Sequence, residues 1–301
     1  MKIVITGANS AVGQAILRGE WRHDPAKNIF VAAVRSARAA EQIRSEAGNT
    51  NAVARISYDD PKSLDAAFEG AGAVIHLAGI LIETPESNYE QANVASTGSV
   101  VEAAKRSAVQ KIVLVSATGA DETSRNRYYR TKGQAEALVR ASGLNYTIVR
   151  APLLLGPGTA GGAALGRHAG HNDAKLIGGG RNFQQPLFVD DLARAAVIAT
   201  SPAVANNLVL DLVGPVSLPE RELVERAARM LGREIRIDSI PKFWFSCVLS
   251  IRQRIGKRGF SRDALEVITS DTRLDPEPAA SALGIELTAI DEMIKKSLGQ
   301  G

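Results

Sequence analysis

The sequence predicts an α/β fold, in which a doubly wound parallel sheet is followed by a smaller, mainly helical C-terminal region. Two observations lead to this prediction. Apolar runs rich in β-branched residues alternate with helical patterns along the first two thirds of the chain. The first of these runs ends in a glycine-containing turn that opens a helix.

Each predicted strand is a continuous apolar run. It lacks the alternation of apolar and polar residues that is typical of a strand with one solvent-exposed face. Strands of a parallel sheet are covered by helices on both faces, so both sides are apolar. The sheet is therefore expected to be of the Rossmann type. The predicted strands are 2–7, 28–35, 52–58, 73–79, 111–119, 145–152 and 207–214. The predicted helices between them include 12–20, 62–69, 88–107 and 131–142.

Changes in the apolar periodicity and glycine content of the sequence divide the chain into four parts. They are a dinucleotide-binding core over 1–155, a glycine-rich loop over 156–183, a return to the core over 184–214 and a small C-terminal domain over 215–301. The glycine-rich part has no sustained period, which predicts a mobile loop over a cleft. Asp190 or Asp191 is expected to cap the helix that follows it. The C-terminal domain is expected to hold helices over 218–231 and 279–298 and to cover a substrate.

Composition excludes several classes of protein. The 301 residues are 45% hydrophobic and 23% charged, as in an ordinary globular protein, and the net charge of +4 is too dispersed for a nucleic-acid reader. The N-terminal apolar stretch is too short for a signal peptide or a membrane span. A single Cys247 and four histidines without zinc-ligand spacing predict no metal site. A cytoplasmic location is expected.

The turn "TGANSAVG" at 6–13 places Gly7, Ser10 and Gly13 at the positions of a G-x-x-G-x-x-G motif. Such a turn exposes backbone N–H groups at a helix N-terminus, where they bind a pyrophosphate. Gly7 would make the tight turn, Gly13 would allow close helix packing, and Ser10 would offer a hydroxyl. An ordinary strand-to-helix turn is the alternative. The predicted cofactor contacts here are Gly7, Asn9, Ser10, Ala11, Val12 and Gly13.

The second strand ends at Arg35, with Arg38 close behind. An NAD-binding chain carries a carboxylate in this region, which accepts from the ribose hydroxyls, whereas a guanidinium suits a 2′-phosphate. The sequence therefore favours NADP(H) over NAD(H). An exposed arginine with no ligand is the alternative.

Tyr128 and Lys132 are four residues apart on a predicted helix and share a face. The ammonium would lower the phenol pKa and make a better general acid, and it could also bond to a cofactor ribose. Thr118 ends a strand at the sheet edge where ligands bind and could orient a substrate oxygen. Ser116 and Tyr129 are the competing hydroxyl and phenol. A chance spacing of two polar residues is the alternative.

These pieces, in this order, resemble the short-chain dehydrogenase/reductase superfamily, its extended and atypical branches in particular. The matching stretches are "TGANSAVG", "HLAG", "QANVASTGSVVEAAKRSAVQKIVLVSATG", "YYRTK", "TIVRAPLLLGPG" and "QPLFVDDLA". The phrase from Arg127 to Pro152 and the closing "LGIELTAIDEMI" are most similar to the atypical group that contains the nucleotide-binding accessory subunit of respiratory complex I.

The resemblance implies a role for each matching residue. Tyr128 would be the proton donor or acceptor, Lys132 its partner and the ribose ligand, and Thr118 the substrate-orienting hydroxyl. Ala78 and Gly79 would line the cofactor, and Pro152 and Leu153 would approach the nicotinamide. Asn93 would be structural, and His76 is expected to be a packed strand residue.

Two residues depart from the family pattern. Ser10 replaces the middle glycine of the phosphate turn, as in atypical members that bind a dinucleotide without turnover. Ser57 stands where an aspartate contacts the adenine in related chains, with Asp59 and Asp60 following.

The resemblance implies an NADP(H)-dependent oxidoreductase that transfers hydride to a carbonyl-like small molecule and works as a monomer or homodimer. A non-catalytic accessory or sensor protein that binds the nucleotide is the first alternative, and an epimerase or dehydratase is the second. Segment 241–260 joins apolar and basic residues. It would cover the substrate cleft or, as the alternative, contact a membrane surface.

Overall fold

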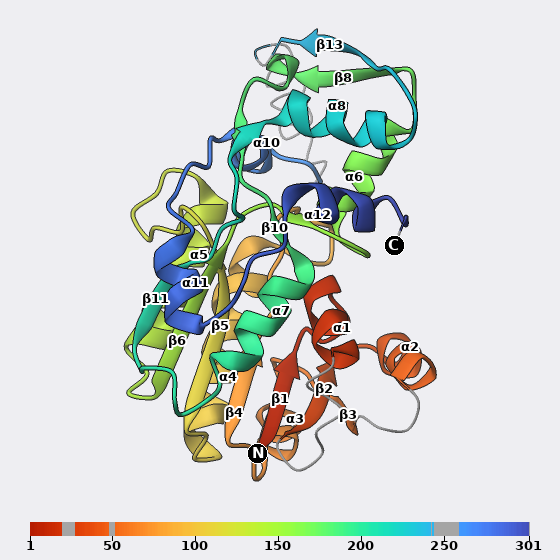
Figure 1. Cartoon of the computed structure of the whole chain (residues 1–301). Helices are drawn as coiled ribbons and strands as arrows, with labels where there is room; N and C mark the ends of the chain where they lie inside the picture. The colour runs from red at the N-terminus through yellow and green to blue at the C-terminus, as the bar shows by residue number, and fades with distance from the viewer. Residues whose placement is uncertain (20–27, 48–51, 242, 244–258, 301) are drawn as a thin grey trace.

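The central element of this computed structural model is a seven-stranded parallel sheet, which confirms the predicted fold (Figure 1). Residues 1–19, 28–47, 52–241, 243 and 259–300 are described. The strands of the sheet are β1 (Lys2–Thr6), β2 (Ile29–Val34), β3 (Ala52–Arg55), β4 (Ala73–His76), β5 (Lys111–Ala117), β6 (Asn145–Ala151) and β11 (Leu208–Asp211). Their order is β11-β6-β5-β4-β1-β2-β3.

The position of β1 determines where a ligand can bind. The chain runs outward from β1 to β2 and β3, then returns to the other side of β1 as β4. Ile5 accordingly pairs with Ala32 on one side and with Ile75 on the other. In open α/β sheets, the crevice at such a reversal, outside the carboxyl ends of the strands, is the usual ligand site.

Helices cover both faces of the sheet, as continuous apolar strands require. One face, carrying Ile3 and Ile5, packs against α1 (Ala11–Arg18), α2 (Ala37–Ala47) and α7 (Val189–Ile198). The other face, carrying Val4, packs against α3 (Pro61–Phe68), α4 (Ser96–Arg106) and α5 (Arg127–Arg140). A six-residue π-helix, η3 (Glu90–Ala95), leads into α4.

The prediction of a mobile loop over 156–183 is wrong. The segment contains α6 (Ala160–Ala169), β8 (Asp173–Ile177) and the short helix η4 (Gly178–Gly180). Thr159 caps α6 by accepting from Gly162 N at 3.0 Å. Its glycines serve close packing, because a Cβ on Gly161 would lie 2.3 Å from the Leu154 carbonyl oxygen.

The smaller region combines this segment with the C-terminal part of the chain. Three two-stranded pairs link its pieces: β7 (Leu154–Leu155) with β10 (Leu187–Phe188), β9 (Phe183–Gln184) with β12 (Leu218–Pro219), and β8 with β13 (Arg236–Ile240). Its other helices are α8 (Glu220–Met230), α10 (Arg262–Thr269), α11 (Glu277–Leu283) and α12 (Ile290–Ser297). The helix predicted over 279–298 is thus divided, because Gly284 takes a left-handed conformation at φ +61°.

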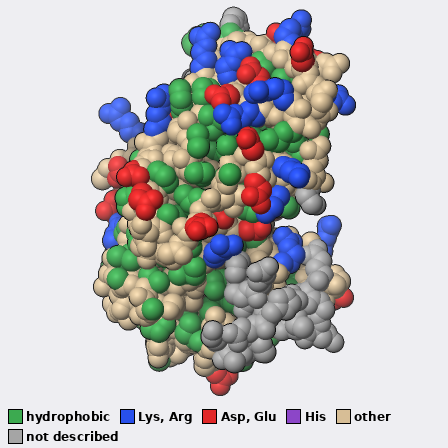
Figure 2. Space-filling view, in the orientation of Figure 1, with side chains coloured by type: hydrophobic (Ala, Val, Ile, Leu, Met, Phe, Trp, Pro, Cys, Tyr) green, Lys and Arg blue, Asp and Glu red, His purple; other side chains and the backbone are tan. Residues whose placement is uncertain are grey.

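Lys and Arg side chains gather at the end of this region that carries α8 and β13 (Figure 2). None of the described helices is long and apolar enough to cross a membrane. The predicted cover or membrane segment, 241–260, lies almost entirely outside the described residues.

Polar side chains fasten the C-terminal segment to the core. The Gln185 amide donates to the carbonyls of Gly214 (2.8 Å) and Leu274 (2.9 Å). Asp191 accepts from the backbone N–H and the hydroxyl of Thr288, at 2.8 and 2.9 Å. The expectation that Asp190 or Asp191 caps the helix is wrong, because α7 begins at Val189, its N-cap is Phe188, and both aspartates lie inside the first turn.

A buried carboxylate holds α5 against β6. Glu136 is fully buried and accepts from Arg150 at 2.9 and 2.7 Å and from Arg140 at 3.0 Å. Two arginines compensate the cost of removing this charge from water, so removing the carboxylate would leave partly buried cations unpaired.

We predict that Glu136→Gln, which preserves the side-chain volume, lowers the free energy of unfolding by about 3 kcal/mol. Glu102→Gln is the matched control, because Glu102 forms an ion pair with Lys105 at 3.0 Å but its side chain is 60% exposed. The control should lose less than about 1 kcal/mol. Urea unfolding measures both values, and equal losses would contradict the prediction.

Candidate functional site

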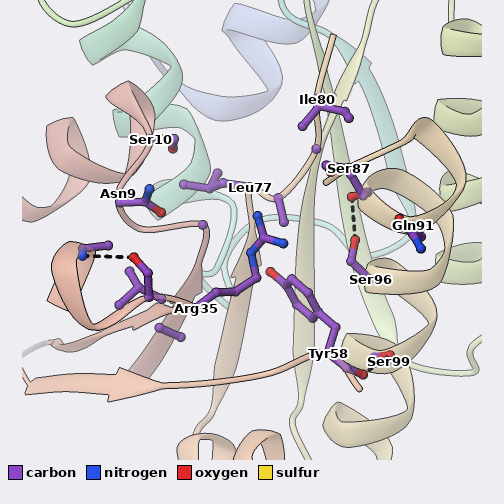
Figure 3. A pocket seen from close by; sticks show the side chains of 18 of the residues that line it. Asn9, Ser10, Arg35, Tyr58, Leu77, Ile80, Ser87, Gln91, Ser96 and Ser99 are labelled. Atoms are coloured by element: carbon purple, nitrogen blue, oxygen red, sulfur yellow. Dashed lines mark hydrogen bonds between the residues drawn. The ribbon is translucent and has the colours of Figure 1, made fainter. Parts of the chain in front are cut away.

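A cavity of about 530 Å³ lies at the carboxyl edge of the sheet, where β1 separates β2 from β4. One wall is the turn after β1, with Gly7, Asn9 and Ser10, and the opposite wall is the face of η3 and α4 (Figure 3). Of the predicted cofactor residues, those that line it are Gly7, Asn9, Ser10, Arg35, Ala78 and Gly79.

The turn after β1 has the geometry expected of a phosphate turn. Gly7 has φ +73°, and a Cβ there would lie 3.0 Å from Ala78 N in the turn after β4. A Cβ on Gly13 would lie 2.5 Å from the Ala8 carbonyl oxygen, so only glycine lets α1 start this close to the turn. Ala11, Val12 and Gly13 do not line the cavity, and Val12 instead packs into the core.

The Ser10 hydroxyl accepts one hydrogen bond within the turn. Its oxygen caps α1 by accepting from Gly13 N at 3.1 Å. Because the oxygen acts as the acceptor, the hydroxyl proton remains available to donate into the cavity. The side chain that replaces the expected glycine therefore orders the helix start and offers a donor to an anion.

Arg35 and Tyr58 lie close together in the middle of the cavity (Figure 3). Among the described side chains, Arg35 has no ion-pair partner. Burial raises the pKa of Tyr58 to about 12, against smaller opposing effects of a hydrogen bond with Thr6 and of the Arg35 charge. The cavity thus contains an unpaired guanidinium beside a neutral phenol.

Ser57, the residue predicted to face the adenine, does not line the cavity. Its N–H donates to Ser63 Oγ at 2.9 Å, and its own Oγ accepts from Asp59 N at 3.3 Å. Both groups close the local turn between β3 and α3. The next two residues, Tyr58 and Asp59, line the cavity in its place.

Lys132 reaches the sheet edge beside the cavity wall without lining the cavity. Its ammonium donates to the Val115 carbonyl at 2.9 Å, and a Cβ added to Gly79 would lie 3.5 Å from Nζ. Desolvation lowers the pKa of Lys132 to about 8, partly offset by Glu136. Asn93 supports the same wall, since its Oδ1 accepts from Ile80 N at 3.1 Å.

Tyr128 lies in the first turn of α5, which Asn126 caps. Its half-buried ring packs against Tyr89 (5.9 Å between centroids) and Tyr129 (5.6 Å), and its hydroxyl has no hydrogen bond to Lys132. Burial raises the pKa of Tyr128 well above 10, and Tyr129 and Tyr89 add to the effect. The expectation that Lys132 lowers this pKa is wrong, because the ammonium is bonded to a strand carbonyl.

Helix α10 of the C-terminal region is fastened beside Tyr128. Asn126 Nδ2 donates to the Asp263 carbonyl at 3.1 Å and to Glu266 Oε2 at 2.9 Å. The backbone N–H of Arg127 donates to Asp263 Oδ1 at 3.0 Å. The C-terminal region therefore packs directly on the turn that carries the predicted acid.

The other predicted residues of the chemical step continue the same sheet edge beyond the cavity. Thr118 follows β5, and its half-buried side chain makes no hydrogen bond to the described residues. Pro152 and Leu153 follow β6 and are also half-buried. Ser116, the competing hydroxyl, is 5% exposed, and its Oγ has no hydrogen-bond partner in the part of the chain that the structure describes.

Sequence reasoning missed over half of the cavity. Ser36 and Asp59 directly follow predicted strands, and Tyr58 and Leu77 lie near the ends of predicted strands, so their position at a carboxyl edge was a usable signal. The helical wall had no such signal, because only the packing of η3 and α4 turns it toward the cavity. This wall includes Gln91, Ala92, Ala95, Ser96 and Ser99.

His76 is the last residue of β4, and its side chain is fully buried between two polar side chains. Its Nδ1 lies 2.6 Å from Thr6 Oγ1, and its Nε2 lies 3.1 Å from Thr97 Oγ1. Desolvation, with a smaller effect of the Lys132 charge, lowers the pKa of His76 to about 3. The imidazole is therefore neutral at physiological pH.

Comparison with known sequences identifies relatives over much of the chain. A family profile described as NAD(P)H-binding matches residues 7–176. Ceramide reductase of Caulobacter vibrioides is 27% identical over 181 residues, which cover 60% of this chain and 57% of that protein. Subunit 9 of the NADH dehydrogenase (ubiquinone) 1 alpha subcomplex of Arabidopsis thaliana mitochondria is 28% identical over 64% of this chain and 50% of its own length. This match confirms the resemblance to the complex I accessory subunit.

Solved structures share the fold over nearly the whole chain. UDP-glucuronic acid 4-epimerase from Bacillus cereus, with UDP-glucuronic acid and NAD, has a TM-score of 0.78 at 16% identity, covering 100% of this chain and 98% of that one. The NADPH-dependent quinone oxidoreductase from Escherichia coli, with NADPH, has a TM-score of 0.72 at 21% identity, covering 97% and 98%.

We predict that His76 makes the protein sensitive to acid. The unfolded chain takes up a proton below pH 6.5, whereas folded His76 resists protonation down to about pH 3, so stability falls as the pH falls between these values. His76→Gln retains a donor and an acceptor but does not titrate. Between pH 6.5 and about 5, the wild type should lose about 2 kcal/mol more than this variant. Urea unfolding of both proteins at the two pH values measures these losses of stability. Equal losses for the wild type and the variant would contradict the prediction.

Proposed function

The chain belongs to the NAD(P)H-binding family, and on this premise we propose that it binds NADP(H) and reduces a carbonyl group of a small molecule. The observation that carries the proposal is the cavity at the reversal of strand order, with a phosphate turn at one wall and an unpaired guanidinium in its middle. The ceramide reductase relative and the NADPH-bound oxidoreductase neighbour are consistent with it.

Two groups of the cavity suit an NADP(H) molecule. The start of α1 presents backbone N–H groups and the Ser10 hydroxyl to the diphosphate, where the helix dipole favours negative charge. Arg35 has no ion-pair partner among the described side chains and lies at the end of β2, where the adenosine ribose is held in this fold. Its planar fork of donors suits a 2′-phosphate, which NADP(H) has and NAD(H) lacks.

In the proposed reaction, bound NADPH supplies a hydride to the carbonyl carbon, and the carbonyl oxygen takes a proton. Tyr128 supplies that proton, since its raised pKa keeps the phenol in the protonated form that a donor needs. The Thr118 hydroxyl, which has no partner among the described residues, orients the oxygen. Lys132, whose Nζ would lie 3.5 Å from a Cβ added to Gly79, would donate to the cofactor ribose.

A second function, nucleotide binding without turnover, is favoured by two observations. Lys132 donates to Val115, and the Tyr128 pKa is raised, whereas an efficient general acid has a pKa near the working pH. The complex I subunit among the relatives fits this alternative. Epimerase chemistry, which the structural neighbour from Bacillus cereus performs, would use the same residues without net oxidation of the nucleotide.

We predict that Arg35→Ser weakens NADPH binding by about tenfold to a hundredfold, because a charged hydrogen bond to the 2′-phosphate is lost. The affinity for NADH should stay within about twofold. Arg38→Ser is the matched control, since Arg38 is exposed and does not line the cavity. Fluorescence titration measures each dissociation constant. An equal loss of affinity for NADPH and NADH would contradict the proposed preference for NADP(H).

We predict that Tyr128→Phe lowers the rate of NADPH oxidation with a panel of aldehydes, ketones and quinones by at least about a hundredfold. Its NADPH affinity should stay within about twofold, because Tyr128 does not line the cavity. Tyr129→Phe, the neighbouring phenol, is the control and should retain activity. An undiminished rate for Tyr128→Phe would exclude its role as proton donor, and wild-type binding without any turnover would favour the accessory function.

A further inference from the structure

A chain of hydrogen bonds, in two halves that meet at Asn93, joins the cavity wall to the turn that carries Tyr128. Its members from β1, β4, η3, α4 and α5 are each no more than 1% exposed: Thr6, His76, Asn93, Thr97 and Thr131. Buried polar groups that satisfy one another in this way form a rigid unit, because breaking any bond leaves an unpaired group away from water.

The direction of the first half follows from the donors and acceptors. Thr97 Oγ1 donates to the Asn93 carbonyl at 2.6 Å, so it can only accept from His76 Nε2, 3.1 Å away. The neutral His76 then accepts at Nδ1 from Thr6 Oγ1, at 2.6 Å. Tyr58, which lines the cavity, packs edge-on against the His76 ring, with 6.3 Å between the ring centroids.

The second half begins at the side chain of Asn93. Its Nδ2 donates to Thr131 Oγ1 at 3.0 Å, and that hydroxyl donates to the Tyr128 carbonyl, also at 3.0 Å. Its Oδ1 accepts from Ile80 N, in the cavity wall. Asn93 lies in the π-helix η3, a wide turn that is often found at functional sites.

We propose that this chain couples the adenosine end of the nucleotide to Tyr128, so that His76, Thr97 and Thr131 are positioning residues that touch neither cofactor nor substrate. A nucleotide that packs on Tyr58 and Arg35 changes the position of the first side chains in this chain of hydrogen bonds. Each donor in the chain has a single acceptor, so the change passes from one member to the next. The change in position therefore reaches Asn93, whose side-chain hydrogen bonds join the cavity wall to the first turn of α5. This inference rests on the proposed nucleotide binding.

The test uses a nucleotide that cannot reach Tyr128 itself. Adenosine 2′,5′-bisphosphate carries the adenosine end of NADP(H) but no nicotinamide. The full chain is labelled with 13C at tyrosine Cζ, and the Tyr128 resonance is assigned by its loss in Tyr128→Phe. In the wild type, titration with the bisphosphate should shift this resonance in step with occupancy of the cavity.

Thr131→Val removes the hydroxyl that links Asn93 to Tyr128 and preserves the shape of the side chain. It should bind the bisphosphate within about twofold of the wild type while the Tyr128 shift falls at least about fivefold, and Thr131→Ser should restore the shift. Thr97→Val interrupts the hydrogen-bond chain at an earlier point and also releases the cavity wall. This variant should lose the Tyr128 shift, and its affinity for the bisphosphate should fall about tenfold.

Thr147→Val is the matched control, since Thr147 is as deeply buried but its Oγ1 has no hydrogen-bond partner among the described residues. It should keep both the affinity and the shift. Should Thr97→Val fail to fold, Thr131→Val tests the coupling alone. Bisphosphate binding without a Tyr128 shift in the wild type, or a full shift in Thr131→Val, would overturn the coupling and leave nucleotide binding intact. No binding by the wild type would overturn both.

Discussion

The close approach of two strand-end turns across the middle of the sheet is the constraint on which the site depends. Because β1 lies between β2 and β4, the turn at Gly7 must pass the turn at Ala78, and a side chain at Gly7 would lie 3.0 Å from the Ala78 nitrogen. Gly7 is also left-handed, with φ +73°, and the turn that it begins leads the chain into α1. The start of that helix, with its free N–H groups, then faces the crevice between the two halves of the sheet.

The carboxyl edge has two electrostatic parts. The cavity between β2 and β4 is polar and contains a charged guanidinium, so it suits a phosphate-bearing ligand. Beyond Gly79, the edge at β5 and β6 is drier, and burial shifts the pKa of Tyr128 upward and that of Lys132 downward. Burial therefore keeps the Tyr128 phenol neutral, while the Lys132 ammonium, with a pKa of about 8, keeps its charge at neutral pH.

The C-terminal region contributes to that dry environment. Asp263 and Glu266 of α10 accept from Asn126 and Arg127 at the start of α5, next to the predicted acid. Gln185 and Asp191 tie the following segment to the core through Leu274 and Thr288. The core and this smaller region therefore share the turn on which the chemistry is proposed to occur, and substrate preference is expected to depend on both.

The sequence by itself determined the fold and the phosphate turn. Continuous apolar strands specify a parallel sheet, and Gly7 and Gly13 are required by local geometry that a motif can express. Arg35 was also predictable, because it directly follows a strand. These features depend on neighbours in the sequence, or on the general rule that parallel strands end at one edge.

Only the tertiary structure decided how the groups of that edge are paired. The Tyr128-Lys132 spacing is that of a helix face, yet Lys132 bonds to Val115 of a strand, so spacing alone could not give the phenol pKa. In the same way, the glycines of 156–183 allow close packing of α6 on Leu154, which composition cannot distinguish from a loose loop. The partner of a buried polar group is set by elements far apart in the chain, and no local pattern encodes it.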